Sequence, residues 1–220
     1  MERKLSGKMN IKKTKHWIKR CLAMLSNEYD ALYPSKNSPP WWLMPIIEPK
    51  SIDWKDKQIR NTKFNITENV CGLTVNYGIV KIGCLSSFVV YDKKGKQISP
   101  TNNEISWTYK RVHNALADIL QHYNAESITL QAKVLEKSNY YNVAPRIYGF
   151  ALYIDGVEQE IVDMAFVLRK YNIEVVPIFG LNKTINEETK ENYSAQSKIS
   201  NVNNKGIICT NRQKSLSFLL

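Results

Sequence analysis

The sequence predicts an α/β fold, a three-layer core with a mixed sheet over residues 71–182 and an extension on either side. Three observations support this fold class. Short β-branched runs fill residues 72–91, apolar residues recur with the period of a helix between 103 and 123, and strand and helix patterns then alternate up to residue 179. This order of elements is typical of helices packed against a sheet.

Residues 1–70 precede the core as a basic helical arm and a segment rich in proline and tryptophan. A basic amphipathic helix is expected over residues 8–33. Beyond it, the dense prolines of residues 34–69 exclude a regular helix or a central strand. The tryptophans of that segment are too apolar for a free linker, so we expect it to lie packed along a surface. These tryptophans are Trp41, Trp42 and Trp54.

The first half of the core is predicted as strands followed by one long helix. Three short apolar runs read as strands, and the turn composition of Asp92–Gly95 ends them. The helix over 103–123 carries one apolar face, with Asn102 or Asn103 as its N-cap. The three runs are residues 72–76, 78–85 and 87–91.

The second half of the core is predicted as strand, basic loop, hairpin, helix and buried strand. The turn residues Asp155-Gly156 favour the hairpin. After Asn182 the chain is polar and is expected to form an extended C-terminal segment over 183–220. The other predicted ranges are the strand 127–135, the loop 137–146, the hairpin arms on either side of 155–156, the helix 161–171 and the strand 173–179.

The positive charge lies mainly outside the predicted core. The chain has a formal net charge of +11. Residues 1–25 contain eight Lys or Arg and one acidic residue, and residues 181–220 contain six basic and three acidic residues. A cationic arm on a nearly neutral body gains affinity for a polyanion by releasing counterions, which favours RNA as the partner. A solvated, disordered arm and an acidic membrane surface are the alternatives.

Catalytic and metal-binding patterns are weak in this sequence. The four cysteines form no C-x-x-C pair and the three histidines lack ligand spacing. No P-loop, G-x-G-x-x-G, G-x-S-x-G or H-E-x-x-H motif occurs. An RNase H-like nuclease needs acidic residues on its first strands, and residues 72–85 contain none. Gln131-x-Lys133 matches only the weak half of another nuclease pattern. We therefore expect no enzyme, no metal and no cofactor.

Sorting signals are limited to the N-terminus. No apolar run approaches the ~18 residues of a membrane span, and no apolar core of a secretory signal is present. The basic, acid-poor N-terminus is similar to an organelle-targeting peptide, although it is rich in Lys rather than Arg.

The stretch Gly78–Gly95 resembles the opening of the universal small-subunit ribosomal protein S-eleven, whose fold is of the RNase H-like type. That family has a strand, a turn at small polar residues, a returning strand and then Asp-basic-x-Gly. The later order, with a final strand running into Pro177-Ile178, extends the resemblance over residues 72–182. The sequence departs from the family at residues 99–104, which contain no Arg, at the extra hairpin of 147–160, and at the mildly charged tail.

The resemblance implies a non-catalytic, structural constituent of the small ribosomal subunit that binds its rRNA on the platform. The implied partners are small-subunit rRNA and neighbouring ribosomal proteins, with no membrane and no small-molecule substrate. A mitochondrial ribosome in the matrix is expected, with the cytoplasm as the alternative. The alternative function is an RNase H-like nuclease or another nucleic-acid-binding protein of a mobile element or virus.

RNA contacts are expected from the basic arm, the first hairpin, the long helix and the basic loop, with two tyrosines placed to stack on bases. These residues are Lys12, Lys13, Lys15, Lys19, Arg20, Ser86, Ser87, Lys93, Lys94, Lys96, Lys110, Arg111, Lys137, Tyr140, Tyr141 and Arg146.

Overall fold

The structure is a computed structural model. It describes residues 26, 30–51, 62–136, 139–185, 193, 197–211 and 215–218. The predicted helix over 8–33 lies mostly outside the described residues, as do the predicted RNA contacts Lys12, Lys13, Lys15, Lys19, Arg20 and Lys137.

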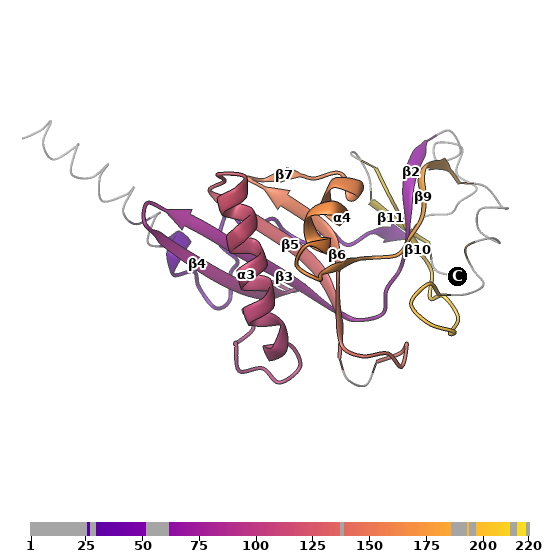
Figure 1. Cartoon of the computed structure of the whole chain (residues 1–220), viewed down its shortest axis with the longest axis horizontal. Coiled ribbons are helices and arrows are strands. Elements are labelled where there is room, and N and C mark those ends of the chain that lie inside the picture. The colour runs from indigo at the N-terminus through magenta and orange to yellow at the C-terminus, as the bar shows by residue number, and fades with distance from the viewer. Residues whose placement is uncertain are drawn as a thin grey trace, which may run out of the picture.

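The larger of two sheets carries helices α3 and α4 on one face (Figure 1). Its strands run in the order β4-β3-β5-β6-β7, and the short β8 adds to β6 in parallel. The strands are β3 (Leu73–Ile82), β4 (Leu85–Asp92), β5 (Ser127–Leu135), β6 (Arg146–Ile154), β7 (Val157–Glu158) and β8 (Glu174–Val175). The helices are α3 (Ser106–His122) and α4 (Ile161–Arg169).

The main core lies between this sheet and the helices. Side chains alternate between the two faces of a strand, so Val75, Tyr77 and Ile79 of β3 share the helix-facing side. They pack with the apolar stripe of α3, which includes Leu116. Tyr77 is fully buried, and its hydroxyl group is 2.8 Å from Thr108 Oγ1 of α3, so the one polar atom of this large side chain has a partner.

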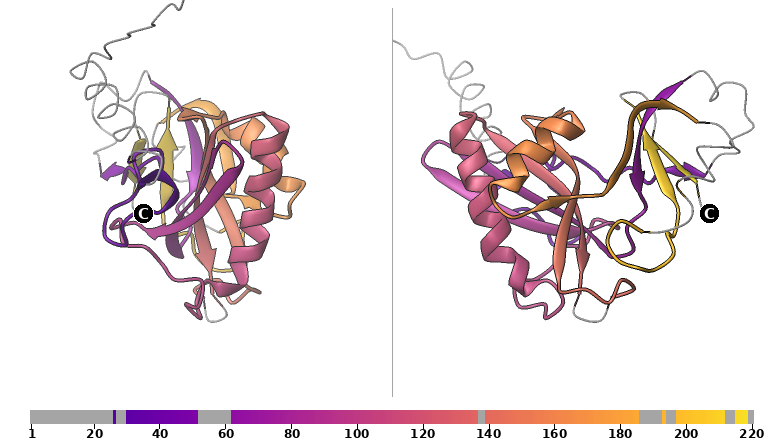
Figure 2. Two further views of the ribbon diagram at one scale, coloured as in Figure 1. Left: turned by 90° about the vertical axis from the view of Figure 1, so that its left-hand side faces the viewer. Right: turned by 45° about the vertical axis from the view of Figure 1, so that its right-hand side comes forward.

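A second sheet packs at one end of the first (Figure 2). Its order is β1-β11-β10-β2-β9, and its small core contains Phe64, Ile66 and the buried thiol of Cys209. Sequence reasoning missed this sheet, because four of its five strands come from segments read as extensions and the fifth, β9, starts at the end of the predicted core. They are β1 (Lys50–Ser51), β2 (Lys63–Glu68), β9 (Ile178–Thr184), β10 (Ile207–Thr210) and β11 (Ser215–Phe218).

The described first part of the proline- and tryptophan-rich segment, residues 34–51, covers the face of the larger sheet that the helices leave free, while Trp54 lies outside the described residues. Trp42 and Leu43 are buried there, and Trp42 Nε1 donates to the Ala31 carbonyl at 3.1 Å. Gly78 makes this contact possible. A Cβ atom at position 78 would lie 2.3 Å from Leu43 Cδ1, closer than any packed side chain allows. The predicted packing of this segment is confirmed for Trp42, whereas Trp41 is 79% exposed.

The mixed α/β class is confirmed, but several predicted elements are displaced. The first hairpin turns at Gly83-Cys84 and not at the serines, because Gly83 adopts the φ of +61° that this turn requires. Helix α3 starts at Ser106 after Ile105, without a side-chain cap. The strand predicted over 173–179 is split at Pro177, whose carbonyl accepts from Glu68 N at 2.9 Å, and β9 joins the second sheet.

The two adjacent tryptophans test the packing of this segment. Trp42→Ala should lower the free energy of unfolding by about 3–5 kcal/mol, since it empties a buried site. Trp41→Ala should change it by less than about 0.5 kcal/mol. Urea unfolding followed by circular dichroism measures both. Equal effects would mean that Trp42 is not anchored on the sheet.

Candidate functional site: a cavity between the two sheets

A cavity of about 230 Å³ opens where the two sheets meet. The larger sheet, the second sheet and the segment before β1 each supply part of its wall. The lining residues include Ile46, Ile47, Glu48, Thr67, Glu68, Asn69, Thr74, Lys93, Lys133, Phe150, Ile161, Val176, Ile208 and Thr210.

The floor of the cavity belongs to a row of polar side chains on β3 and β5. The register pairs Thr74 with Lys133 and Asn76 with Gln131, so these four side chains share the face away from the helices. Thr74 and Lys133 are half-buried, whereas Asn76 and Gln131 are buried, and polar side chains in such positions on central strands are unusual. The first pair lines the cavity, and the second lies under the tryptophan-rich segment.

Asn76 and Gln131 fix the backbone of that segment at the edge of the cavity. Asn76 Nδ2 donates to the Met44 carbonyl at 2.8 Å, and Gln131 Nε2 donates to the Met44 and Pro45 carbonyls at 3.1 and 3.0 Å. These bonds satisfy carbonyls that no strand partner reaches. They also set where Glu48, three residues further along, enters the cavity wall.

Two lysines and one glutamate dominate the electrostatics of the cavity. Lys133 Nζ donates to Thr74 Oγ1 at 2.7 Å, and Lys93 Nζ lies 3.0 Å from Glu48 Oε1. Burial lowers the pKa of Lys133, and the nearby charge of Lys93 lowers it further. The hydrogen bond and the charge of Lys93 hold the pKa of the Glu48 carboxyl below its usual value.

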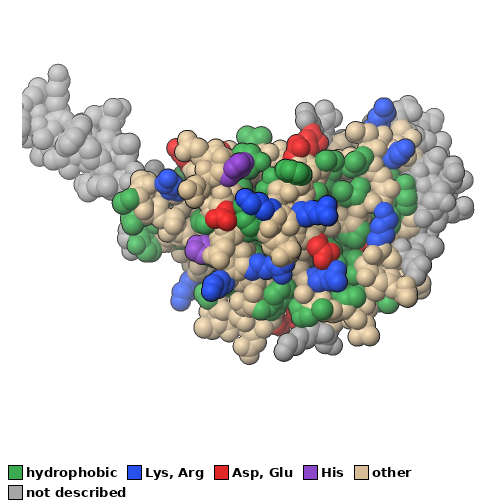
Figure 3. Space-filling view, viewed as in Figure 1, with side chains coloured by type: hydrophobic (Ala, Val, Ile, Leu, Met, Phe, Trp, Pro, Cys, Tyr) green, Lys and Arg blue, Asp and Glu red, His purple; other side chains and the backbone are tan. Residues whose placement is uncertain are grey.

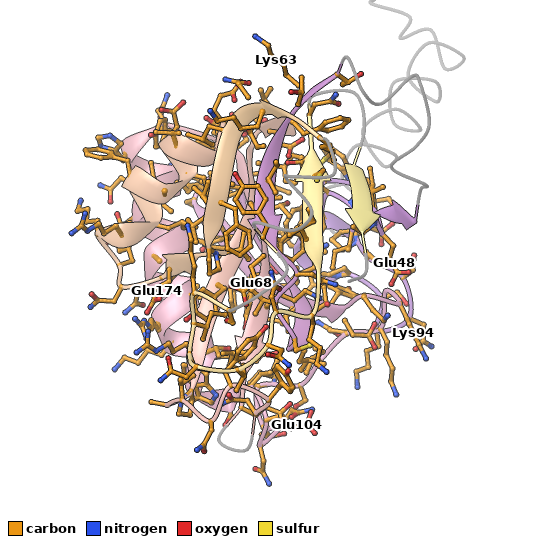
Figure 4. All side chains as sticks on the ribbon, turned by 90° about the vertical axis from the view of Figure 1, so that its right-hand side faces the viewer. Glu48, Lys63, Glu68, Lys94, Glu104 and Glu174 are labelled. Atoms are coloured by element: carbon orange, nitrogen blue, oxygen red, sulfur yellow. The ribbon has the colours of Figure 1, made fainter. Side chains whose placement is uncertain are left out.

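Glu68 lines the cavity from β2 of the second sheet and is fully buried. Its Oε1 accepts from Ser197 Oγ at 2.5 Å and its Oε2 accepts from Lys198 N at 3.0 Å. Figure 4 shows it in the middle of the molecule, among the strands of both sheets. The carboxylate therefore ties residues 197–198 to β2 and closes one side of the cavity.

Other reactive groups lie away from the cavity lining. Burial raises the pKa of the Cys209 thiol to about 12, so it remains protonated and unreactive at neutral pH. Among the described residues, no three His, Cys, Asp or Glu side chains come together as a metal site. Over the same residues, no helix is both long and apolar enough to cross a membrane.

Of the predicted RNA contacts that fall within the described residues, Lys93 alone lines the cavity. Lys94 and Lys96 are exposed on the turn after β4, where their backbone N–H groups donate to Asp92 Oδ1. Ser86 and Ser87 lie at the opposite end of the same strand. Arg146 pairs with Glu174 at 3.0 Å on β6 and β8.

Lys110 and Arg111 lie on α3, on the far side of the sheet from the cavity. Figure 3 shows Lys and Arg side chains spread over this helical face. Arg111 is already engaged, since Nε donates to the Tyr171 carbonyl at 3.3 Å and a second nitrogen donates to the Asn172 carbonyl. Arg111 therefore satisfies two backbone carbonyls of the turn that follows α4.

The two tyrosines predicted to stack on bases differ in access. Tyr140 is 40% exposed, its hydroxyl donates to the Asn203 carbonyl, and Lys205 lies over its ring at 4.4 Å. Tyr141 is 1% exposed, and its hydroxyl accepts from Cys71 N at 2.8 Å. Base stacking by Tyr141 is a wrong prediction, because the ring is inside the core.

Thr74 and Lys133 were missed as a pair, although the sequence carried a signal. In the strands around them, polar residues recur at every second position: Thr74 and Asn76 on one, and Thr129, Gln131 and Lys133 on the other. When two central strands both alternate in this way, they predict a polar face inside the protein. Polar side chains there need hydrogen-bonding partners. Only the pairing of β3 with β5 shows that the two rows coincide.

Comparisons with known proteins identify the fold. No protein-family model and no curated protein match the chain. Solved structures of an RNA ligase from Naegleria gruberi do. A variant with ATP and manganese is 14% identical with a TM-score of 0.62, and covers 83% of this chain and 58% of its own. A variant with AMP and manganese is 14% identical with a TM-score of 0.63, over 82% and 57%. The enzyme with pyrophosphate is 17% identical with a TM-score of 0.54, over 83% and 61%.

The chain thus has the fold of part of an RNA ligase and spans about three-fifths of that enzyme's length. This finding overturns the assignment to the ribosomal S-eleven family and with it the structural role in the small subunit, the ribosomal partners and the RNase H-like type. The physical reason is the second sheet, which the resemblance did not include. The sequence analysis also predicted that the chain is not an enzyme and has no small-molecule substrate. Both predictions are contradicted, because the similar structures are of an enzyme, and one of them contains ATP. The mitochondrial location stays an untested prediction.

The buried carboxylate of Glu68 can be tested against an exposed one. Glu68→Gln places an amide where two donors converge, so one donor loses its partner and unfolding should become about 1–3 kcal/mol easier. Glu104→Gln, at the lower edge of Figure 4, should have almost no effect on the urea midpoint. If the two variants unfold alike, Glu68 does not hold residues 197–198 against β2.

Proposed function

We propose that this chain is a nucleotide-dependent enzyme acting on RNA, with its nucleotide bound in the cavity between the two sheets. One observation carries the proposal. A chain with the fold of an RNA ligase has an enclosed cavity at the junction of its sheets, and that cavity presents two lysines. Cavities at such junctions, with apolar walls and a few polar groups, are the usual form of small-molecule sites.

The lining of the cavity matches the two halves of a nucleotide. Lys93, Lys133 and the Thr74 hydroxyl form a cationic end that suits phosphates. Ile46, Phe150 and other apolar side chains supply surface for a base. The volume of about 230 Å³ is slightly below the roughly 300 Å³ at the lower end of ligand sites, so a nucleotide would extend out of the opening.

The ligands of the neighbouring structures define the reaction class that we propose. ATP, AMP and pyrophosphate are related by cleavage of the bond between the α phosphorus and its bridging oxygen. In a nucleotidyl transfer, an acceptor attacks the α phosphorus and pyrophosphate leaves with the bridging oxygen. Lysines fixed beside the phosphates stabilise the charge on the leaving group without reorganising. The net charge of +11 favours association with an RNA acceptor.

The described residues do not form a site for the manganese of the neighbouring structures. Glu48 is paired with Lys93, and both oxygens of Glu68 accept hydrogen bonds from residues 197–198. No further acidic side chain lines the cavity within the described part of the chain. We therefore assign no step to a metal ion.

ATP binding tests the proposed site directly. Lys133→Met should weaken ATP binding by tenfold or more, because it removes a charge-assisted hydrogen bond worth about 1.5–3 kcal/mol. Lys110→Met, on the far face of the sheet, should leave the affinity within about twofold. Isothermal titration calorimetry of the full chain measures both. Equal affinities in the two variants would place ATP outside the cavity.

Lys133→Met should also raise the melting temperature at pH 7, by about 2–4 °C for each 1 kcal/mol gained. Burial disfavours the charged lysine, as its lowered pKa indicates, so an apolar chain of similar length fits the folded state better. Thermal unfolding without nucleotide measures this. A clear fall in melting temperature would show that Lys133 is present for stability and not for a ligand.

Enzymatic activity is tested with ATP labelled at the α phosphate and an RNA with a 5′-phosphate. The full chain should transfer label to protein or RNA, and Lys133→Met should reduce the rate by tenfold or more. If neither protein nor RNA becomes labelled at any concentration while ATP still binds, the transfer reaction is rejected and only nucleotide binding stands.

A further inference from the structure

We propose that Glu48 occupies the phosphate subsite in the absence of nucleotide, and that a di- or triphosphate binds by displacing it from Lys93. The inference rests on the proposed function, since it assigns the cationic end of the same cavity. It adds a residue that competes with the ligand, where the proposed function names only residues that attract it.

The Lys93–Glu48 ion pair is exposed to solvent, so little free energy is needed to separate the two side chains. The Nζ–Oε1 distance is 3.0 Å, but the two side chains remain 52% and 69% exposed. An exposed pair of this kind contributes little to stability, because water and salt screen it and both side chains lose freedom. A ligand with two or more negative charges can therefore replace the single carboxylate.

Lys133 leaves unused donors beside that pair. An ammonium group has three donors, and the one bond described for Lys133 goes to the neutral Thr74 hydroxyl. Among the described residues, no carboxylate lies within 4 Å of its nitrogen, since the ion pairs found there are Lys93–Glu48 and Arg146–Glu174. A partly desolvated cation with no carboxylate in contact favours an anion in the cavity.

The three charged groups influence one another. The charge of Lys93 lowers the pKa of Lys133 and the charge of Glu48 raises it, while Lys133 in turn helps to lower the pKa of the Glu48 carboxyl. These three groups carry one net positive charge at the lysine side of the cavity, while the carboxylate of Glu68, which also lines it, is held by Ser197 and Lys198. A pyrophosphate group placed between the lysines would neutralise their repulsion, but it would repel Glu48.

The backbone bonds to Asn76 and Gln131 keep Glu48 close to this opening. They hold the Met44 and Pro45 carbonyls on the larger sheet. Rotation of the Glu48 side chain alone is therefore enough to vacate Lys93, without moving the segment. The carboxylate can return as soon as the ligand leaves.

The test compares Glu48→Gln with an ion pair of matching geometry elsewhere. Glu174 lies 3.0 Å from Arg146, with side chains 48% and 45% exposed, on a surface outside the cavity. ATP and inorganic pyrophosphate are titrated into the full chain with a chelator and then with manganese. Glu48→Gln should tighten both ligands about three- to tenfold, as expected from removing a competing charge. Glu174→Gln should leave both affinities unchanged.

The other outcomes separate this inference from the proposed function. If Lys133→Met weakens binding but Glu48→Gln has no effect or weakens it, the nucleotide site stands and the displacement is rejected. Weakening by Glu48→Gln in manganese alone would make Glu48 a metal ligand and would also reject it. If wild type binds neither ligand but Glu48→Gln does, the displacement is supported. If no variant binds either ligand, both proposals fail.

Discussion

The pairing of β3 with β5 is the constraint on which the rest of the structure depends. Its register places Val75, Tyr77 and their neighbours under the helices, and Thr74, Asn76, Gln131 and Lys133 on the opposite face. A slip of one residue would exchange the two faces, burying the lysine in the main core and exposing the apolar row. The same register therefore fixes both the hydrophobic core and the polar floor of the cavity.

The second sheet turns that polar floor into a cavity. Its strand β2 carries Glu68, which draws residues 197–198 against the sheet, and β10 adds Ile208 and Thr210 to the wall. These segments are far apart in the chain, at residues 63–68, 178–184 and 207–210. The cavity forms only when these three segments have come together in the second sheet, so its formation is coupled to the completion of the fold.

Sequence reasoning recovered the local elements and missed the long-range ones. Helices α3 and α4, the hairpin at Asp155-Gly156 and the burial of Trp42 follow from periodicity, turn chemistry and apolar character, which are local properties. The second sheet pairs β2 with β9 and β10 across more than a hundred residues, and no local pattern encodes that pairing. Without the second sheet the order of elements resembled the ribosomal family. Lys133 was set aside because Gln131-x-Lys133 matched only half of a nuclease pattern, and its partner Thr74 lies 59 residues away, beyond the reach of a local pattern.

The central claim is that the cavity between the sheets holds a nucleotide at Lys93 and Lys133. A crystal structure of the full chain with ATP tests it most directly. The account predicts the phosphates within hydrogen-bond distance of both Nζ atoms and the Glu48 carboxylate turned away from Lys93. ATP bound elsewhere, for example in the groove between α3 and α4 lined by Tyr123 and Phe166, would contradict it.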